Sequence, residues 1–467
     1  MSQRERRRGR NQGMSELFDA AAIALEAARE AGADAADAVG VASDSIETRV
    51  RGEEIDFVKQ ARQRTLGVRA LVRGPEGVRQ AIASTADFAE AAVRAVAAEA
   101  ATLARATAQD PAAGLPEAGF ADPDALPDLA LLDPADRGTG VEDRVEAARR
   151  AERAARAVDP RITNSEGSQA SSGFSRVVYA NSAGFAAGYE SASHALFSEP
   201  LASGEGGMQR DYWMSVGRRL AELEAPERIG ARAAERALRR LGAKPVPTCE
   251  VPVIFDPLTA ASLWRQVAGL VNGYSVYRGT SFLAGKLGET VASQAVHLVD
   301  DPLRPGGLGS RPFDGEGLPS RRTVLIEKGR LESYLLDTYS ARKLGLASNA
   351  HATRSAGSAP GAGATNLFLE PGQGSLEDLI ADTPRGLLVT ELIGMGFNPV
   401  TGDYSRGAAG IWIENGALTH PVEEVTIAAN FADMLQGIDA VADDLLWLSS
   451  VASPSLRVAR MTVAGEA

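Results

Sequence analysis

The pattern of hydrophobic positions changes its period within the N-terminal part of the chain. Residues 15–31 carry apolar side chains every three or four positions, which is typical of a helix with one buried face. Residues 39–50 and 66–72 alternate with period two, as half-buried antiparallel strands do. The alanine-rich stretch 85–106 returns to the helical period. The pattern therefore predicts a mixed helix–sheet domain over residues 14–110.

A proline-rich segment follows this domain. Residues 111–135 contain five prolines, and proline both fixes the backbone and removes a hydrogen-bond donor, so we expect a linker here. Beyond it, a highly charged helix is predicted over 141–158 and hairpins over 163–188. These elements define a middle domain over 136–225.

The chain from 226 to 467 is rich in glycine, and its elements are short. It opens with a predicted helix over 226–241. The strand candidates that follow are 251–255, 323–326, 387–392 and 410–414, and the helix candidates are 257–271, 339–344, 376–380 and 427–435. We expect 226–467 to be a β-rich C-terminal domain. The fold class of the whole chain is then α+β, with mixed helix–sheet N-terminal and middle domains.

The charge balance argues against nucleic acid and membranes as partners. The chain has 49 Lys and Arg against 61 Asp and Glu, a formal net charge of −12. An acidic protein needs a local basic patch to bind a polyanion, and the visible one is the arginine-rich segment 1–13, which we expect to be a disordered basic tail. No apolar run approaches the roughly 20 residues that span a bilayer.

Candidate metal ligands are scarce. The chain has one cysteine, Cys249, which excludes a disulfide framework within the chain and favours a reducing cytoplasm. No two of the four histidines fall within one predicted element, so no helical pair can start a zinc site, although a site assembled from distant segments stays open. His194 and His297 lie in apolar, strand-like surroundings that favour structural roles, whereas His351 and His420 are predicted to lie in loops.

Two carboxylates in the glycine-rich loop 312–317 are candidates for chemistry. Asp314 and Glu316 lie two positions apart with glycine beside them, which lets the backbone approach another segment closely. That arrangement suits a buried turn as well as a substrate site, and both interpretations stay open.

Five segments of the C-terminal half together resemble a known family. They are PFDGEG at 312–317, VLIEKGRLESYLLDTYSARKLG at 324–345, TNLFLEPGQGSLEDLI at 365–380, GLLVTELIGMGFNPVTGDYSRGAAGIWIENG at 386–416 and IAANFADMLQGIDAVADDL at 427–445. Their order and spacing resemble the TldD/PmbA family, in particular its PmbA branch, also called TldE. The resemblance covers nearly all of 226–467.

The resemblance implies a pair of related subunits that form a cytosolic zinc-dependent protease acting on unfolded or extended peptides. In that family the TldD-type subunit holds the zinc. Two histidines and a glutamate in an H-E-x-x-x-H helix, with a cysteine near the C-terminus, make up its site. Zinc polarises the peptide carbonyl and lowers the pKa of bound water, and the glutamate acts as base.

The positions that match this motif hold other residues here. Trp264 and Gly269 stand where the family has histidines, and Arg265 stands where it has the glutamate. The C-terminal segment 444–454 contains no cysteine. The resemblance therefore implies that zinc and the catalytic base are absent from this chain and belong to a TldD-type partner.

Three functions are compatible with these residues. The favoured one is a non-catalytic TldE/PmbA-type subunit of a TldD/TldE zinc metalloprotease complex that cleaves or matures unfolded peptides. The alternative is a stand-alone homodimer that binds peptides or assists assembly without cleaving them. A third is an enzyme with an unrecognised site. The loops that would contact the peptide or a partner are predicted to contain Asp314, Glu316, Asn398, Asp403 and Ser405.

Overall fold

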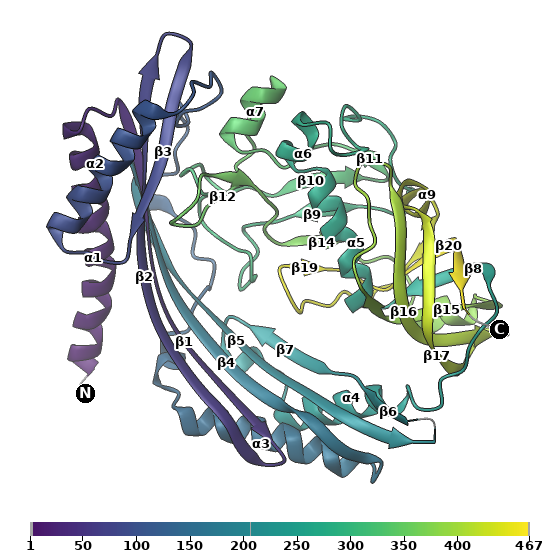
Figure 1. Cartoon of the computed structure of the whole chain (residues 1–467). Coiled ribbons are helices and arrows are strands. Elements are labelled where there is room, and N and C mark those ends of the chain that lie inside the picture. The colour runs from purple at the N-terminus through teal and green to yellow at the C-terminus, as the bar shows by residue number, and fades with distance from the viewer. Residues whose placement is uncertain (1–2, 206, 466–467) are drawn as a thin grey trace.

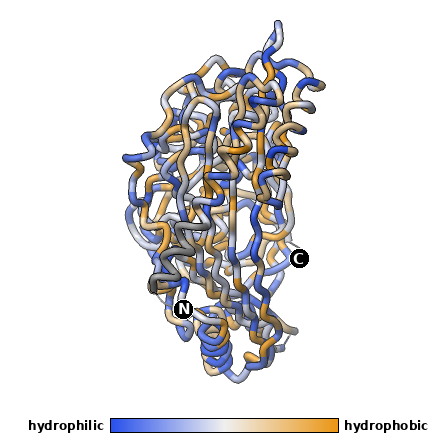
Figure 2. Tube along the Cα trace, turned by 90° about the vertical axis from the view of Figure 1, so that its left-hand side faces the viewer, coloured by the Kyte–Doolittle hydropathy of each residue, from blue (hydrophilic) through white to orange (hydrophobic). Residues whose placement is uncertain are grey.

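The chain folds into two parts that face each other. The structure is a computed structural model that describes residues 3–205 and 207–465, with side chains described from residue 13 onward. Figure 1 shows a long curved sheet from the first half of the chain and a C-terminal domain on its concave side. Figure 2 shows hydrophilic and hydrophobic residues interspersed along the whole chain.

The first part is one seven-stranded antiparallel sheet, with the order β3-β2-β1-β4-β5-β6 and β7 paired to β5. Its strands are β1 (Ala35–Arg51), β2 (Glu54–Gly74), β3 (Gly77–Thr85), β4 (Ile162–Asn181), β5 (Ala186–Gly204), β6 (Gly207–Arg210) and β7 (Trp213–Gly217). Strand β1 pairs with β4 from Asp37 opposite Asn181 to Val50 opposite Ser168. The segments predicted as separate N-terminal and middle domains therefore share one sheet.

Two helix pairs pack on this sheet. Helices α1 (Gln3–Glu30) and α2 (Glu90–Ala106) bury alanine-rich faces against it at one end, and α3 (Val141–Val158) packs with α4 (Pro226–Leu238) at the other. The α3–α4 contact is close, because a Cβ on Gly230 would come within 2.0 Å of the Ala151 carbonyl oxygen. The boundary expected at 226 consequently lies after α4, which belongs with the sheet.

The C-terminal domain is β-rich, which confirms the predicted α+β class. Its strands are β8 (Cys249–Phe255), β9 (Leu298–Asp300), β10 (Thr323–Glu327), β11 (Arg330–Leu331), β12 (Ala352–Thr353), β13 (Gly361–Ala362), β14 (Leu367–Leu369), β15 (Arg385–Ile393), β16 (Asp403–Glu414), β17 (Ala417–Asn430), β18 (Ile438–Val441), β19 (Val451–Ala452) and β20 (Leu456–Ala464). Its helices are α5 (Pro257–Leu270), α6 (Gly273–Tyr277), α7 (Thr338–Leu344), α8 (Leu376–Ala381) and α9 (Phe431–Gln436).

Helix α5 is the central helix of this domain. One sheet has the order β17-β16-β15-β8-β20-β18, and a second has the order β11-β10-β9-β14-β19. Helix α5 contacts β8 and β15 of the first and β14 and β19 of the second, and its apolar side chains join the largest hydrophobic core of the chain. The position of α5 is therefore fixed by two sheets.

The structure differs from several predictions of local structure. Residues 427–430 continue strand β17 where a helix was expected, so α9 begins only at Phe431. His420 also lies in β17 and not in a loop. Helix α1 includes residues 3–13, which were expected to form a disordered tail, and residues 1 and 2 lie outside the described part of the chain.

The proline-rich segment 111–135 lies against both parts of the molecule. It contains two short 3-10 turns, Pro123–Ala125 and Pro134–Gly138. The Ala121 N–H donates to the Gly317 carbonyl in the C-terminal domain, and the Leu131 carbonyl accepts from the Ala192 N–H in the sheet. The linker is thus held in place by backbone hydrogen bonds. Within the ranges described, no helix combines the length and hydropathy needed to cross a bilayer.

A buried charge cluster also joins the two parts. Asp37 on β1 is paired with Arg69 on β2 at 2.5 Å and with Arg354 of the C-terminal domain at 2.5 Å, and all three side chains are at most 4% exposed. Burial acts to raise the pKa of Asp37, but the two guanidinium groups outweigh it and hold the pKa below its usual value.

Candidate functional site

The first candidate site is the face of helix α5 that carries the residues singled out from the sequence. Asp256 caps the helix by accepting a hydrogen bond from the Thr259 N–H, and Pro257 occupies the first turn. Arg265 and Gly269 lie four residues apart on an exposed face, whereas Trp264 is fully buried in the core. The three positions therefore do not share one solvent-facing surface.

The segment 447–453 lies directly beside α5. The Trp264 Nε1–H donates to Ser453 Oγ at 2.9 Å, and Arg265 Nη2 donates to Ser449 Oγ at 2.8 Å. The two segments that the family resemblance pairs, one in a helix and one near the C-terminus, are thus neighbours in space.

The side chains gathered there do not fit a zinc ion. Zinc takes thiolate, imidazole or carboxylate ligands, and a catalytic site needs three of them. The groups present are an indole, a guanidinium and two hydroxyls, and Gly269 has no side chain. Arg265 adds a positive charge that repels a cation. Across the described chain, no group of three or more His, Cys, Asp or Glu side chains is placed to hold a metal ion.

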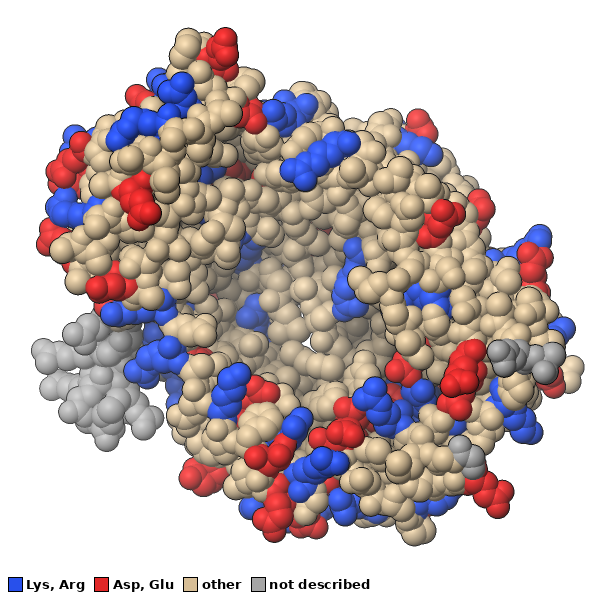
Figure 3. Space-filling model, in the orientation of Figure 1, with Lys and Arg blue, Asp and Glu red and all other residues tan. Residues whose placement is uncertain are grey.

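The α5 face borders a charged cleft between the sheet and the C-terminal domain. Figure 3 shows this side of the molecule hollowed between the two parts, with Lys and Arg side chains inside the hollow. A cleft of about 340 Å³ is lined by Glu199, Arg210, Asp211, Tyr212, Arg240, Leu258, Thr259, Ser262, Thr390, Glu391, Leu392 and Arg406. We call it the arginine cleft. No sequence motif pointed to it, because its residues come from segments that are far apart along the chain.

Asp314 is a structural residue of a buried turn. Its Oδ1 accepts hydrogen bonds from the N–H groups of Glu316 and Leu318, and its Oδ2 accepts one from the N–H of Ala352. The side chain is 1% exposed, and burial raises its pKa. Of the two interpretations left open by the sequence, these contacts favour the buried turn.

Glu316 is equally buried but lines a small cavity. Its Oε2 accepts a hydrogen bond from the Thr338 N–H at 2.9 Å. The cavity of about 220 Å³ is also lined by Arg69 and by the stacked rings of Tyr274 and Tyr339. Burial and the neighbouring Asp314 raise the pKa of Glu316 to about 7. The carboxyl is therefore neutral in a substantial fraction of molecules near neutral pH.

The other predicted loop residues lie in the connection between β15 and β16 and at the start of β16. The backbone N–H of Asn398 donates to the Asp403 carbonyl, and the N–H of Ser405 donates to the Gly396 carbonyl. Asn398, Asp403 and Ser405 are all exposed. They belong to a different loop from Asp314 and Glu316, which lie between β9 and β10.

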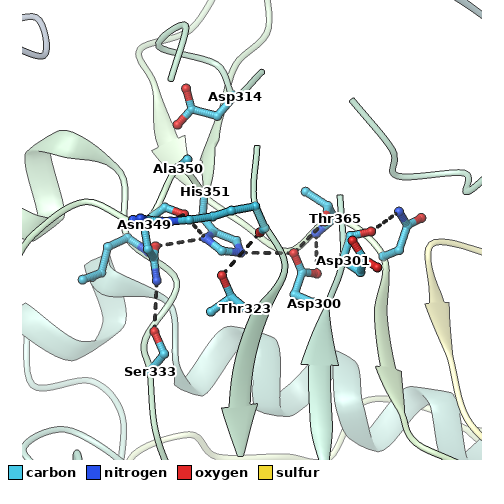
Figure 4. Close-up of polar contacts among 12 residues, drawn as sticks. Asp300, Asp301, Asp314, Thr323, Ser333, Asn349, Ala350, His351 and Thr365 are labelled. Atoms are coloured by element: carbon cyan, nitrogen blue, oxygen red, sulfur yellow. Dashed lines mark hydrogen bonds and ion pairs between the residues drawn. The ribbon is translucent and has the colours of Figure 1, made fainter. Parts of the chain in front are cut away.

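Two of the four histidines, His194 and His351, belong to buried hydrogen-bond networks. His194 is 1% exposed and bonds Ser172 Oγ through Nδ1 at 2.7 Å, which matches the structural role expected for it. His351 lies outside the helices and strands, as expected, yet it is fully buried. Its Nε2 lies 3.1 Å from Asp300 Oδ2, and Asp300 also accepts from the N–H and hydroxyl of Thr365 (Figure 4). This network fastens two loops to strand β9.

Comparison with known sequences establishes the family to which the chain belongs. The chain matches three family profiles: PmbA/TldA metallopeptidase domain 1 over residues 36–104, the central domain over 135–241 and the C-terminal domain over 248–465. The chain belongs to the PmbA/TldD metallopeptidase family. The central domain ends at 241, just after α4, in agreement with the packing of that helix on the sheet.

Relatives of this family cover almost the whole chain. The sequence is 37% identical to metalloprotease PmbA of Escherichia coli O157:H7 over 451 residues, which are 96% of each chain. A Bacteroides thetaiotaomicron protein described as a modulator of DNA gyrase is similar in structure, with a TM-score of 0.86, 29% identity and coverage of 96% and 98%. TldE from Thermococcus kodakarensis shares the fold, with a TM-score of 0.84 at 24% identity and coverage of 94% and 99%.

Proposed function

We propose that this chain is the non-catalytic TldE/PmbA-type subunit of a two-chain zinc metallopeptidase. In this proposal, zinc and the general base come from a TldD-type partner, and the present chain completes the chamber that holds an extended peptide. The observation that carries the proposal is the α5 site. Trp264 contacts Ser453, Arg265 contacts Ser449, and Gly269 follows on the same helix; none of these residues offers a zinc ligand.

The shape of the molecule supports a chamber wall. The concave side of the sheet and the C-terminal domain enclose the hollow seen in Figure 3, and helix α5 lies between the two C-terminal sheets. An extended peptide can bind such a surface through main-chain hydrogen bonds to strand edges, which gives affinity with little demand on sequence. The net charge of −12 favours a peptide over a nucleic acid as the occupant.

This chain's own residues would bind and orient the peptide. Arg265 presents a guanidinium where the family's catalytic subunit has its base, so it can hold a carbonyl or carboxylate oxygen but cannot accept a proton. Zinc in the partner would polarise the scissile carbonyl. We expect the complex to act in the cytoplasm.

Assembly with a partner tests this proposal. The chain is mixed with a purified TldD-type subunit, and the mass of the complex is measured by sedimentation velocity. We expect a heteromeric complex that neither chain forms alone. A chain that stays a homodimer in the presence of the partner would contradict the proposal and favour the stand-alone peptide-binding protein.

A further inference from the structure

The arginine cleft is lined by three arginines and three carboxylates, and two further arginines and one carboxylate, Arg236, Arg239 and Asp256, are connected to them through Asp211 and through each other. Five arginines meet four carboxylates in and around it: Arg210, Arg236, Arg239, Arg240 and Arg406 on one side, and Glu199, Asp211, Asp256 and Glu391 on the other. Three of the arginines are well paired. Arg210 contacts Glu199 at 2.8 Å, Arg236 contacts Asp211 at 3.1 Å, and Arg240 is paired with Glu391.

Among the arginines that line the cleft, Arg406 is the one for which the described chain provides no carboxylate partner. It lines the cleft from strand β16, is half-buried, and forms no ion pair with any carboxylate in the described residues. Its Nε is buried and has no hydrogen-bond partner within the part of the chain that the structure covers. The polar group beside it is the hydroxyl of Tyr404, which carries no charge to balance it. A partly buried guanidinium with unused donors is a ready site for an oxyanion.

Arg239 adds a second poorly compensated charge next to the cleft. Its Nη2 lies 3.9 Å from Asp211 Oδ2, and both Nε and Nη2 are buried without a hydrogen-bond partner among the described residues. Asp211 already accepts the Arg236 Nε–H and the Tyr212 N–H through Oδ1. One carboxylate therefore serves two guanidinium groups.

The cleft also opens toward the α5 face. Leu258 and Ser262 of the first turns of α5 line it, and Tyr212 at its wall is close enough to Arg265 to act on that side chain electrostatically. A helix N-terminus favours negative charge nearby. An anion in the cleft would consequently lie beside the same helix face that carries Arg265.

We propose that the arginine cleft binds a carboxylate of the peptide, with Arg406 as its main ion-pair partner. The carboxylate comes either from the peptide C-terminus or from an acidic side chain, because both present the same pair of oxygens to a guanidinium fork. The inference rests on the proposed function in that the anion belongs to a peptide. It adds a charge preference to a chamber that otherwise binds main chain.

Peptide binding to the isolated full-length chain tests this inference without a partner subunit. Fluorescence anisotropy is measured with a short N-terminally labelled peptide of alanine, serine and threonine in three forms: the free acid, the C-terminal amide, and the amide with one internal glutamate. We expect one of the two carboxylate forms to bind about tenfold more tightly than the neutral amide at low salt, and the tighter form identifies the source of the carboxylate. Equal affinity for all three forms overturns the inference.

Two variants assign the effect to the cleft. Arg406→Gln removes the charge that lacks a carboxylate partner and should abolish the preference, so that the carboxylate forms bind no more tightly than the amide. Glu391→Gln removes the carboxylate that neutralises Arg240, so it should strengthen binding of the free acid or glutamate form, which misfolding cannot mimic. Arg322→Gln, which removes an arginine paired with Glu370 outside the cleft, is the control and should behave as the wild type.

The outcomes separate this inference from the proposed function. A preference retained in Arg406→Gln, or an unchanged carboxylate affinity in Glu391→Gln, contradicts the cleft assignment even if the complex with a TldD-type subunit forms. A preference lost in Arg406→Gln supports the cleft even if no such complex forms.

Discussion

The indole N–H of Trp264 on helix α5 hydrogen-bonds to the hydroxyl of Ser453, 189 residues later in the chain, at 2.9 Å. The family resemblance implies that the corresponding helix and C-terminal segment of a TldD-type subunit supply zinc ligands. Here the same two segments meet through a tryptophan and a serine. The contact holds helix α5 against the C-terminal segment 447–453.

The Trp264–Ser453 contact should have a measurable structural role. We expect Trp264→Phe and Ser453→Ala each to lower the free energy of unfolding by about 1 kcal/mol. Each substitution removes the hydrogen bond between the two side chains and leaves the remaining polar group buried without it. Trp264→Ala should cost about 3–5 kcal/mol through the cavity it leaves. Urea denaturation of the two single variants and the double variant gives the coupling energy. A coupling energy of zero would show that the hydrogen bond does not stabilise the site.

Restoring the motif on α5 should not restore a metalloprotease. The triple variant Trp264→His, Arg265→Glu and Gly269→His places the family's helix residues back, but position 264 points into the core and no cysteine lies in the facing segment. We expect no stoichiometric zinc by metal analysis and no peptide cleavage. Zinc-dependent cleavage by this variant would mean that the fold lies closer to catalysis than the proposal holds.

Glu316 should make stability fall with rising pH. Its pKa is raised from an ordinary value of 4.5 to about 7, so the folded state binds the proton more tightly than the unfolded state. The contribution of protonated Glu316 to the free energy of unfolding, up to about 3 kcal/mol, is therefore lost as the pH rises from about 4.5 to about 7. Glu316→Gln keeps an acceptor for the Thr338 N–H, and its free energy of unfolding, measured by urea denaturation, should no longer fall over this pH range. Glu377 is exposed, so Glu377→Gln should retain the pH dependence of the wild type. The same pH dependence of stability in both variants would contradict the raised pKa of Glu316.

Asp37 should be essential for joining the sheet to the C-terminal domain. Asp37→Asn leaves Arg69 and Arg354 buried without their carboxylate, which should cost about 3–5 kcal/mol at pH 7. Because the folded-state pKa of Asp37 lies below 3.8, wild-type stability from this cluster should vanish only as pH falls through that lowered value. The control Asp56→Asn breaks an exposed pair with Arg49 and should cost less than about 1 kcal/mol. Equal losses for the two variants would contradict the role of Asp37.

Helices and strands were predictable from the sequence where the hydrophobic residues follow one clear spacing, either that of a helix or that of a strand. The predicted helix 141–158 coincides with α3, and the strand candidates 251–255 and 323–326 lie within β8 and β10. The Asn-Gly dipeptide at 415–416 forms the expected hairpin turn, with positive φ at both residues. The prediction of a helix over 427–435 was wrong in its first part. Val425 and Ile427 are buried two positions apart, as in a strand, and a short apolar run is compatible with either a helix or a strand.

Long-range features were not predictable in the same way. The pairing of β1 with β4 joins segments on either side of the proline-rich linker, and no local sequence pattern predicts this pairing. The arginine cleft likewise depends on charges that only the tertiary fold brings together. The α5 positions were singled out through the family resemblance, because several motifs in register fixed the alignment. In the structure, 264 and 265 contact 453 and 449.

Metal content and peptidase activity, measured with and without a TldD-type partner, test most directly whether this chain is a non-catalytic subunit. Zinc per chain is determined by mass spectrometry after exhaustive dialysis, and cleavage of an unstructured labelled peptide is followed in the same samples. We expect no stoichiometric zinc and no cleavage for the isolated chain, and both zinc and cleavage for the assembled pair. One zinc per chain together with peptide cleavage by the isolated protein would contradict this expectation.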